Sequence, residues 1–92
     1  MAPSERAKQC ISAAEGGCAA SLTLLGVWHR EGEEGLQQDD VKAAALFRTA
    51  ADLGDVDAHG LLAWCYVEGK GLEQNGALAV AWMRKFSLGP GD

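Results

Sequence analysis

Two stretches of this chain carry the same residues in the same order, one after the other. A shift of about 37 residues places Leu25 on Leu62 and Glu31 on Glu68, and this period is typical of stacked repeat proteins. With one loop residue fewer in the second copy, the match continues through Gly35 with Gly71, Leu36 with Leu72, Gln38 with Gln74, Ala43 with Ala79, Ala45 with Ala81 and Arg48 with Arg84. Repeat units bury their apolar faces against one another, so the pattern predicts a short array of similar units.

Apolar residues recur at helical spacing along the chain, and no segment shows the alternation of a β-strand. Polar residues suited to helix N-caps precede the expected helices, namely Ser4, Asp39 or Asp40, Asp55 and Asn75. The sequence therefore predicts an all-α fold, with a leading helix followed by two helix-loop-helix units. We expect one repeat domain over residues 1–92, divided into a leading helix or half-repeat at 5–16 and units at 17–53 and 54–89.

Glycines recur at matching places in the two units. Gly32 and Gly35 in the first unit, and Gly69 and Gly71 in the second, are expected to supply the positive φ angles of a tight inter-helix turn. Gly26 lies inside an expected helix, where glycine costs about 1 kcal/mol relative to alanine. A glycine there predicts a close approach between two helices.

The composition limits the kinds of partner. The chain has 92 residues, a formal net charge of −5, 48% hydrophobic residues and only 8 Lys or Arg residues. No nucleic-acid partner and no anionic membrane partner is expected, because phosphate binding needs clustered cations. No apolar run reaches the ~20 residues of a membrane span, and no signal-peptide pattern precedes the first charges. A cytoplasmic location is expected, with an organelle matrix as the alternative.

A known repeat motif runs through the second unit. Its residues are Ala51, Gly54, Leu62, Ala63, Tyr66, Gly69, Gly71, Leu72, Asn75, Ala79 and Trp82. This pattern resembles the Sel1-like repeat (SLR), a relative of the tetratricopeptide repeat with a longer loop. The resemblance covers roughly residues 5–89. The first unit departs from the pattern at His29, where an aromatic residue is usual, and at Leu46.

The resemblance implies a right-handed α/α superhelix (solenoid) that acts as an adaptor between proteins and has no shared catalytic residues. In such solenoids the first helix of each unit lines the concave face, which is the usual binding surface. The expected function is a protein-protein interaction module that binds a partner protein or peptide through this face. The alternative is a structural piece of a larger repeat scaffold or oligomer that assembles through its open ends.

Trp64 is the strongest candidate for a binding residue. On a helical wheel it lies away from the apolar stripe formed by residues 58, 61, 62, 65 and 66. Trp and Arg dominate the energetics of interfaces. The predicted partner-binding residues are Trp64 with its neighbours and their counterparts in the first unit: Thr23, Val27, Arg30, Gly60, Trp64 and Val67. The alternative is that Trp64 packs against the neighbouring helix.

The last helix offers a second candidate surface. Trp82, Met83 and Phe86 lie on one side of it, and only the residues SLGPGD follow, which offer no further helix to cover this side. Terminal units of repeat arrays normally carry a polar outer face. The isolated chain is therefore expected to be either marginally stable or self-associating through this helix.

The sequence offers no catalytic, metal or cofactor site, and the chain is not expected to be an enzyme. A hydrolase is disfavoured because no nucleophile-base pair is visible. His29 and His59 lie out of register in the two units, so we interpret them as packing residues. The odd number of cysteines, Cys10, Cys18 and Cys65, is interpreted as reduced, buried and slow to react.

Overall fold

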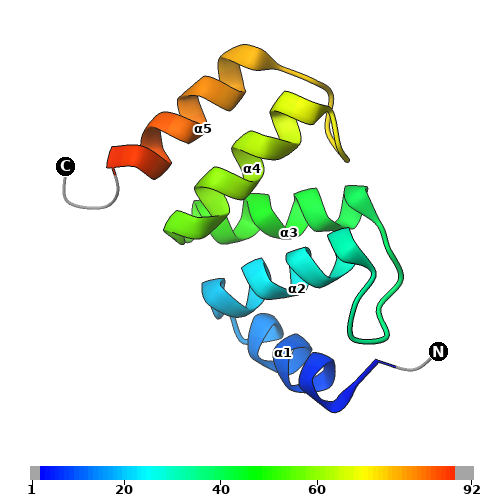
Figure 1. Ribbon diagram of the computed structural model, residues 1–92. Coiled ribbons are helices and arrows are strands. Elements are labelled where there is room, and N and C mark those ends of the chain that lie inside the picture. Colours follow the sequence, from blue (N-terminus) through cyan, green and yellow to red (C-terminus); the bar gives the residue numbers. More distant parts are fainter. Residues whose placement is uncertain (1–2, 89–92) are drawn as a thin grey trace.

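The computed structural model describes the backbone of residues 3–88 and the side chains of residues 3–85. Its five helices are α1 (Glu5–Glu15), α2 (Ala19–Glu31), α3 (Asp40–Asp52), α4 (Val56–Glu68) and α5 (Gly76–Leu88). Each helix packs mainly against the helices before and after it in the sequence, and they follow one another in this order across Figure 1. The described residues contain no strand. The prediction of an all-α solenoid is confirmed.

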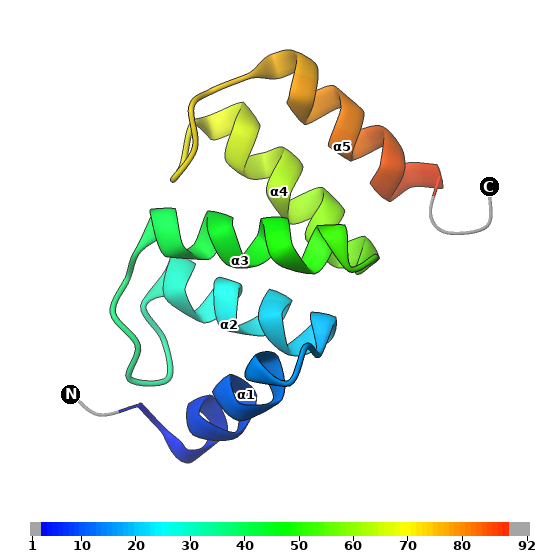
Figure 2. The ribbon, with the colours of Figure 1, turned by 180° about the vertical axis from the view of Figure 1, so that it is seen from behind.

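Helices α3 and α4, which come from neighbouring units, cross at different depths of the molecule. Helix α4 passes in front of α3 in Figure 1 and behind it in Figure 2, where the molecule is seen from the other side. Helix α3 packs against both α2 and α4. The described chain measures 38 × 28 × 15 Å along its principal axes, so the stack is a thin, elongated body.

Three of the predicted N-caps are confirmed. The side chains of Ser4, Asp39 and Asn75 each accept a hydrogen bond at 3.1 Å from the backbone N–H three residues later. Asp55 also occupies an N-cap position, but its side chain makes no capping hydrogen bond to α4. The prediction that Asp55 caps its own helix is therefore wrong, because its carboxylate contacts another helix instead.

The loop glycines adopt the conformation that their positions required. Gly32, Gly35, Gly69 and Gly71 have φ angles of 73°, 78°, 68° and 75°. Gly71 has a second reason to be glycine, because a Cβ at this position would collide with the backbone carbonyl of Asp40. The loop between α4 and α5 thereby lies directly against the start of α3.

The core is built around Phe47, Leu62 and Cys65, the largest side chains that are fully buried. Gly26 lies against this core, since a Cβ added to it would come within 2.6 Å of Phe47 Cε1. The close approach predicted at Gly26 is thus confirmed, and it occurs between α2 and α3.

Candidate functional site

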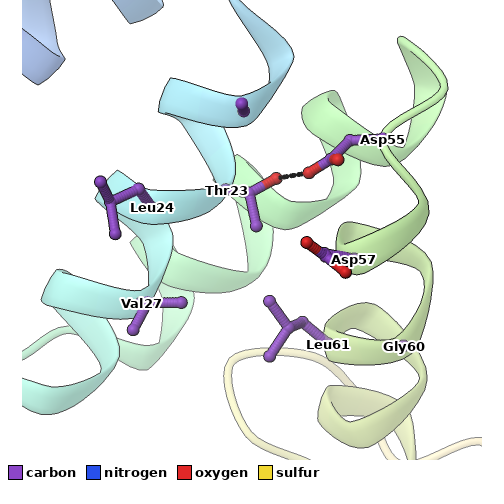
Figure 3. A pocket seen from close by; sticks show the side chains of 8 residues that line it. Thr23, Leu24, Val27, Asp55, Asp57, Gly60 and Leu61 are labelled. Atoms are coloured by element: carbon purple, nitrogen blue, oxygen red, sulfur yellow. Dashed lines mark hydrogen bonds between the residues drawn. The ribbon is translucent and has the colours of Figure 1, made fainter.

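A groove with a volume of about 680 Å³ opens between α2 and α4, the first helices of the two units. Its lining residues are Ala20, Thr23, Leu24, Val27, Asp55, Asp57, Gly60 and Leu61. We call this surface the α2–α4 groove. Figure 3 shows it from close by, with Val27 of α2 and Leu61 of α4 pointing toward each other across it.

One end of the groove is acidic. Asp55, just before α4, accepts a hydrogen bond through Oδ2 from the hydroxyl of Thr23 on α2 (Figure 3). The Thr23 oxygen also lies 3.1 Å from the Ala19 carbonyl, but it has one proton, and the bond to the charged carboxylate is the stronger of the two. Asp57 is exposed in the first turn of α4. Two carboxylates therefore flank the same end of the groove.

The middle of the groove is apolar. Leu24 of α2 is 41% exposed, which is high for a large aliphatic side chain. Val27 and Leu61 are half-buried and pack against the edge of the core. An apolar side chain from a partner could bury these three residues further, and each Å² removed from water contributes about 25 cal/mol.

The other end of the groove is marked by an aromatic-cation pair. The Arg30 guanidinium lies 5.2 Å from the centre of the Trp64 ring, within the range of a cation-π contact. Arg30 Nε also lies 3.0 Å from the Glu31 carboxylate. Both Arg30 and Trp64 are half-buried, so this contact joins α2 to α4 beyond the apolar middle.

The six predicted partner-binding residues are distributed along these two helices. Thr23, Val27 and Gly60 line the groove, Arg30 and Trp64 meet at its end, and Val67 is 43% exposed on the last turn of α4. Trp64 also packs against the core. These contacts agree with the alternative interpretation, in which Trp64 packs against the neighbouring helix, and a binding role of Trp64 stays a prediction.

Thr23 differs from its predicted place. It is only 7% exposed, because its side chain is turned between the helices toward Asp55. It is therefore a residue that positions Asp55 and not an accessible contact residue.

Five of the groove residues were missed by the sequence pattern. Leu24 and Leu61 were assigned to the apolar core stripes, Asp55 was interpreted only as a helix N-cap, and Ala20 and Asp57 were not singled out. A signal for the two aspartates exists, since the matching positions in the first unit are the uncharged Cys18 and Ala20. Two charges that appear in one copy of a repeat and not in the other indicate a role beyond the shared fold.

The predicted C-terminal surface is partly buried against α4. Trp82 is half-buried, and the centre of its ring lies 5.4 Å from that of His59 on α4. Met83 is 47% exposed. The side chain of Phe86 lies outside the described residues. Among the described residues of this predicted surface, Met83 is therefore the one whose side chain is exposed.

Each histidine has a ring nitrogen close to a backbone carbonyl of another segment. His29 is 7% exposed, and its Nδ1 lies 3.0 Å from the Gln37 carbonyl in the following loop. His59 is half-buried, with Nε2 3.3 Å from the Ala51 carbonyl of α3. Among the described residues, no group of three or more His, Cys, Asp and Glu side chains is arranged to hold a metal ion. In the same part of the chain, no helix is both long and apolar enough to cross a membrane.

The three cysteines are free, but they are not alike. Burial raises the pKa of the Cys10 thiol, and it raises the pKa of Cys65 to about 11. Cys18 is exposed at the N-cap position of α2, and hydrogen bonding by Ser21 lowers the pKa of its thiol. The expectation that all three thiols are buried is therefore wrong for Cys18, which lies outside the core.

The sequence pattern of the Sel1 repeat matches residues 19–55 and again residues 56–88. The fold is similar to that of a Sel1 repeat protein from Oxalobacter formigenes, with a TM-score of 0.86 and 28% identity over 89% of this chain and 62% of that one. It is also similar to cysteine rich protein B of Helicobacter pylori, with a TM-score of 0.83 and 26% identity over 89% of this chain and 61% of that one.

A third similar structure is a protective antigen of uropathogenic Escherichia coli strains that displays an SLR fold. It has a TM-score of 0.83 and 34% identity over 89% of this chain and 17% of that one. The chain thus spans less than two thirds of the length of each of these three proteins. No curated protein sequence matches it significantly. With the repeat pattern matched over both units and the fold shared with these structures, the chain belongs to the Sel1 repeat family.

Proposed function

We propose that this chain is a non-catalytic module that binds an extended segment of a partner protein in the α2–α4 groove. Sel1 repeat proteins are generally protein-interaction modules. The observation that supports the groove as the site is its position and lining. It lies between the first helices of the two units, with the exposed Leu24 and the half-buried Val27 and Leu61 at its centre.

The dimensions of the groove suit a short peptide. From Ala20 to Arg30, α2 rises by about 15 Å, because each helical residue adds about 1.5 Å. An extended chain covers about 3.4 Å per residue, so roughly five residues of a partner would span this distance. A segment of this size gains little from backbone contacts alone, and its affinity would come from one or two side chains placed in the groove.

A random-peptide display library, with each peptide flanked on both sides by Gly-Ser segments, tests the proposal. Peptides selected on the wild-type chain are expected to lose binding to Leu24→Glu, which places a charge in the apolar middle of the groove. They should keep binding to Val41→Glu, a matched change at a side chain that is 67% exposed on α3. Circular dichroism melts verify that both variants remain folded. Peptides that bind Leu24→Glu as well as the wild type would show that the groove is not the site.

We also propose a second, structural role, assembly through the open face of α5. Val80 and Met83 are 56% and 47% exposed on α5. Their counterparts in the first unit, Ala44 and Phe47 on α3, are both 0% exposed. The face that the first unit covers with the next helix is thus open in the second unit, and a further repeat or a second copy of this chain could cover it.

A further inference from the structure

The two aspartates of the α2–α4 groove form no ion pair with any described side chain. The ion pairs among the described residues join Arg6 to Glu34, Arg30 to Glu31 and Arg48 to Asp52. None of them includes Asp55 or Asp57. Arg30, the cationic side chain of α2, lies about two turns of the helix beyond Thr23, where it contacts the Glu31 carboxylate and the Trp64 ring.

The positive ends of the helix dipoles do not neutralise this acidic pair. The N-termini of α2 and α4 both lie at this end of the groove, since its lining includes Ala20 and Asp57. Each N-terminus contributes about half a positive elementary charge. Two ionised carboxylates therefore leave a net negative charge of about one at the end of the groove.

Asp55 is oriented toward the groove and away from its own helix. Asp39 and Asn75 hold N-cap positions like that of Asp55, and both use their side chains to cap their helices. Asp55 instead directs Oδ2 to the buried Thr23 hydroxyl, and no protein donor among the described residues reaches its Oδ1. Asp55 therefore contacts α2 through its carboxylate and does not cap α4.

We propose that the α2–α4 groove selects partner segments that carry a Lys or Arg side chain next to an aliphatic residue. The cation lies against Asp55 and Asp57, and the aliphatic side chain fits between Val27 and Leu61 beside Leu24. This specificity rests on the proposed function of the groove. It agrees with the charge of the whole chain, which is −5 and favours cationic over acidic partners.

The peptide selection described above also tests this specificity, through the amino-acid composition of the peptides that it enriches. The Gly-Ser flanks keep free N-terminal amines out of the groove, so a cation must come from a side chain. Enriched peptides are expected to carry Lys or Arg next to Leu, Ile or Val. An acetylated, amidated peptide of the most enriched sequence should bind at least about threefold more weakly when its cationic residue is replaced by norleucine.

The matched variant is Asp55→Asn/Asp57→Asn. Asparagine keeps the shape of the side chain and can still accept the Thr23 hydrogen bond, so the fold is retained. The affinity for the cationic peptide should fall about tenfold, and the dependence of the wild type on salt should weaken. Glu33→Gln/Glu73→Gln removes the same charge from two exposed loop residues at the other ends of the helices and should leave the affinity unchanged.

The outcomes separate the specificity from the function of the groove. If aliphatic peptides without a cation are enriched, or if the aspartate variant binds as tightly as the wild type while Leu24→Glu does not bind, the specificity is wrong and the groove remains the site. A loss of affinity of equal size in the loop variant would attribute the effect to net charge and overturn the specificity. If no peptides are enriched, both proposals fail.

Discussion

At the scale of single residues, the packing of α2 on α3 depends on the absence of a side chain at Gly26. The Phe47 ring fills the space that a side chain at this position would occupy, and Phe47 is 0% exposed. A fully buried ring has no free volume into which it could turn, because protein interiors are packed like crystals. The sequence predicted a close approach at Gly26, but it did not identify Phe47 as the partner.

Gly26→Ala is expected to destabilise the chain by about 1 kcal/mol, the middle of a net range of about 0–2 kcal/mol. Alanine improves helix propensity by about 1 kcal/mol, but overpacking a filled core costs about 1–3 kcal/mol. Thermal melts followed by circular dichroism would show a fall of several degrees, since about 1 kcal/mol shifts Tm by roughly 4–8 °C in a domain of this size. Gly76→Ala is the control, because a Cβ there meets nothing within 4 Å. Equal melting temperatures for the two variants would contradict the packing argument.

The cysteines give a second prediction at this scale. The thiolate is the reactive form, so the lowered pKa and full exposure of Cys18 should make it react first with iodoacetamide near neutral pH. Cys10 and Cys65, with raised pKa values and buried thiols, should react slowly until the chain unfolds. Mass spectrometry after timed alkylation measures each site. The rate at Cys18 should reach half its maximum at a lower pH than for an unstructured thiol, and Cys18→Ser should remove the fast phase.

At the scale of helices, the contact between α4 and α5 includes the ring pair of His59 and Trp82. The planes of the two rings are tilted by 37° relative to each other. His59 Nε2 also lies 3.3 Å from the Ala51 carbonyl, so His59 links its own helix α4 to both α3 and α5. Its Nδ1 is buried and has no hydrogen-bond partner among the described residues. The ring contact should therefore contribute more to stability than the polarity of the imidazole does.

A double-mutant cycle with His59→Ala and Trp82→Ala measures this contact. We expect a coupling energy of about 0.5–1.5 kcal/mol in urea unfolding, as for other aromatic pairs. His59→Phe keeps a ring and removes the unpartnered nitrogen, so it should cost less stability than His59→Ala. Additive single effects, with no coupling, would mean that the two rings do not stabilise each other.

The helices also show what the sequence could and could not predict. Local signals placed the helices, three of the four caps and the loop glycines correctly, because capping and positive φ depend on neighbours in the chain. Leu24 and Leu61 were misplaced because α2 and α4 each contact two other helices. Their apolar faces are wide, and periodicity does not locate the edge of a wide face. The contact of Asp55 with Thr23 joins residues 32 apart, which no local pattern predicts.

At the scale of the whole molecule, the two end helices differ in their open faces. The exposed residues of α1 are mostly polar, namely Glu5, Arg6, Lys8, Gln9, Ser12, Ala13 and Glu15. The exposed side chains of α5 include Leu78, Val80 and Met83. A polar outer face is what closes a repeat array. Among the described residues, the exposed face of α1 is thus mostly polar and that of α5 is partly apolar.

The open face predicts self-association of the isolated chain at high concentration. Covering Val80 and Met83 with a second copy removes apolar surface from water, and this association should raise the melting temperature as the protein concentration increases. Val80→Gln/Met83→Gln should abolish both effects, and it should leave the monomer folded because both side chains are about half exposed or more. Val41→Gln, at an exposed position on α3, is the matched control. Light scattering over a concentration series measures the mass. If the mass and melting temperature of the wild type do not change with concentration, α5 does not mediate assembly of this chain with itself.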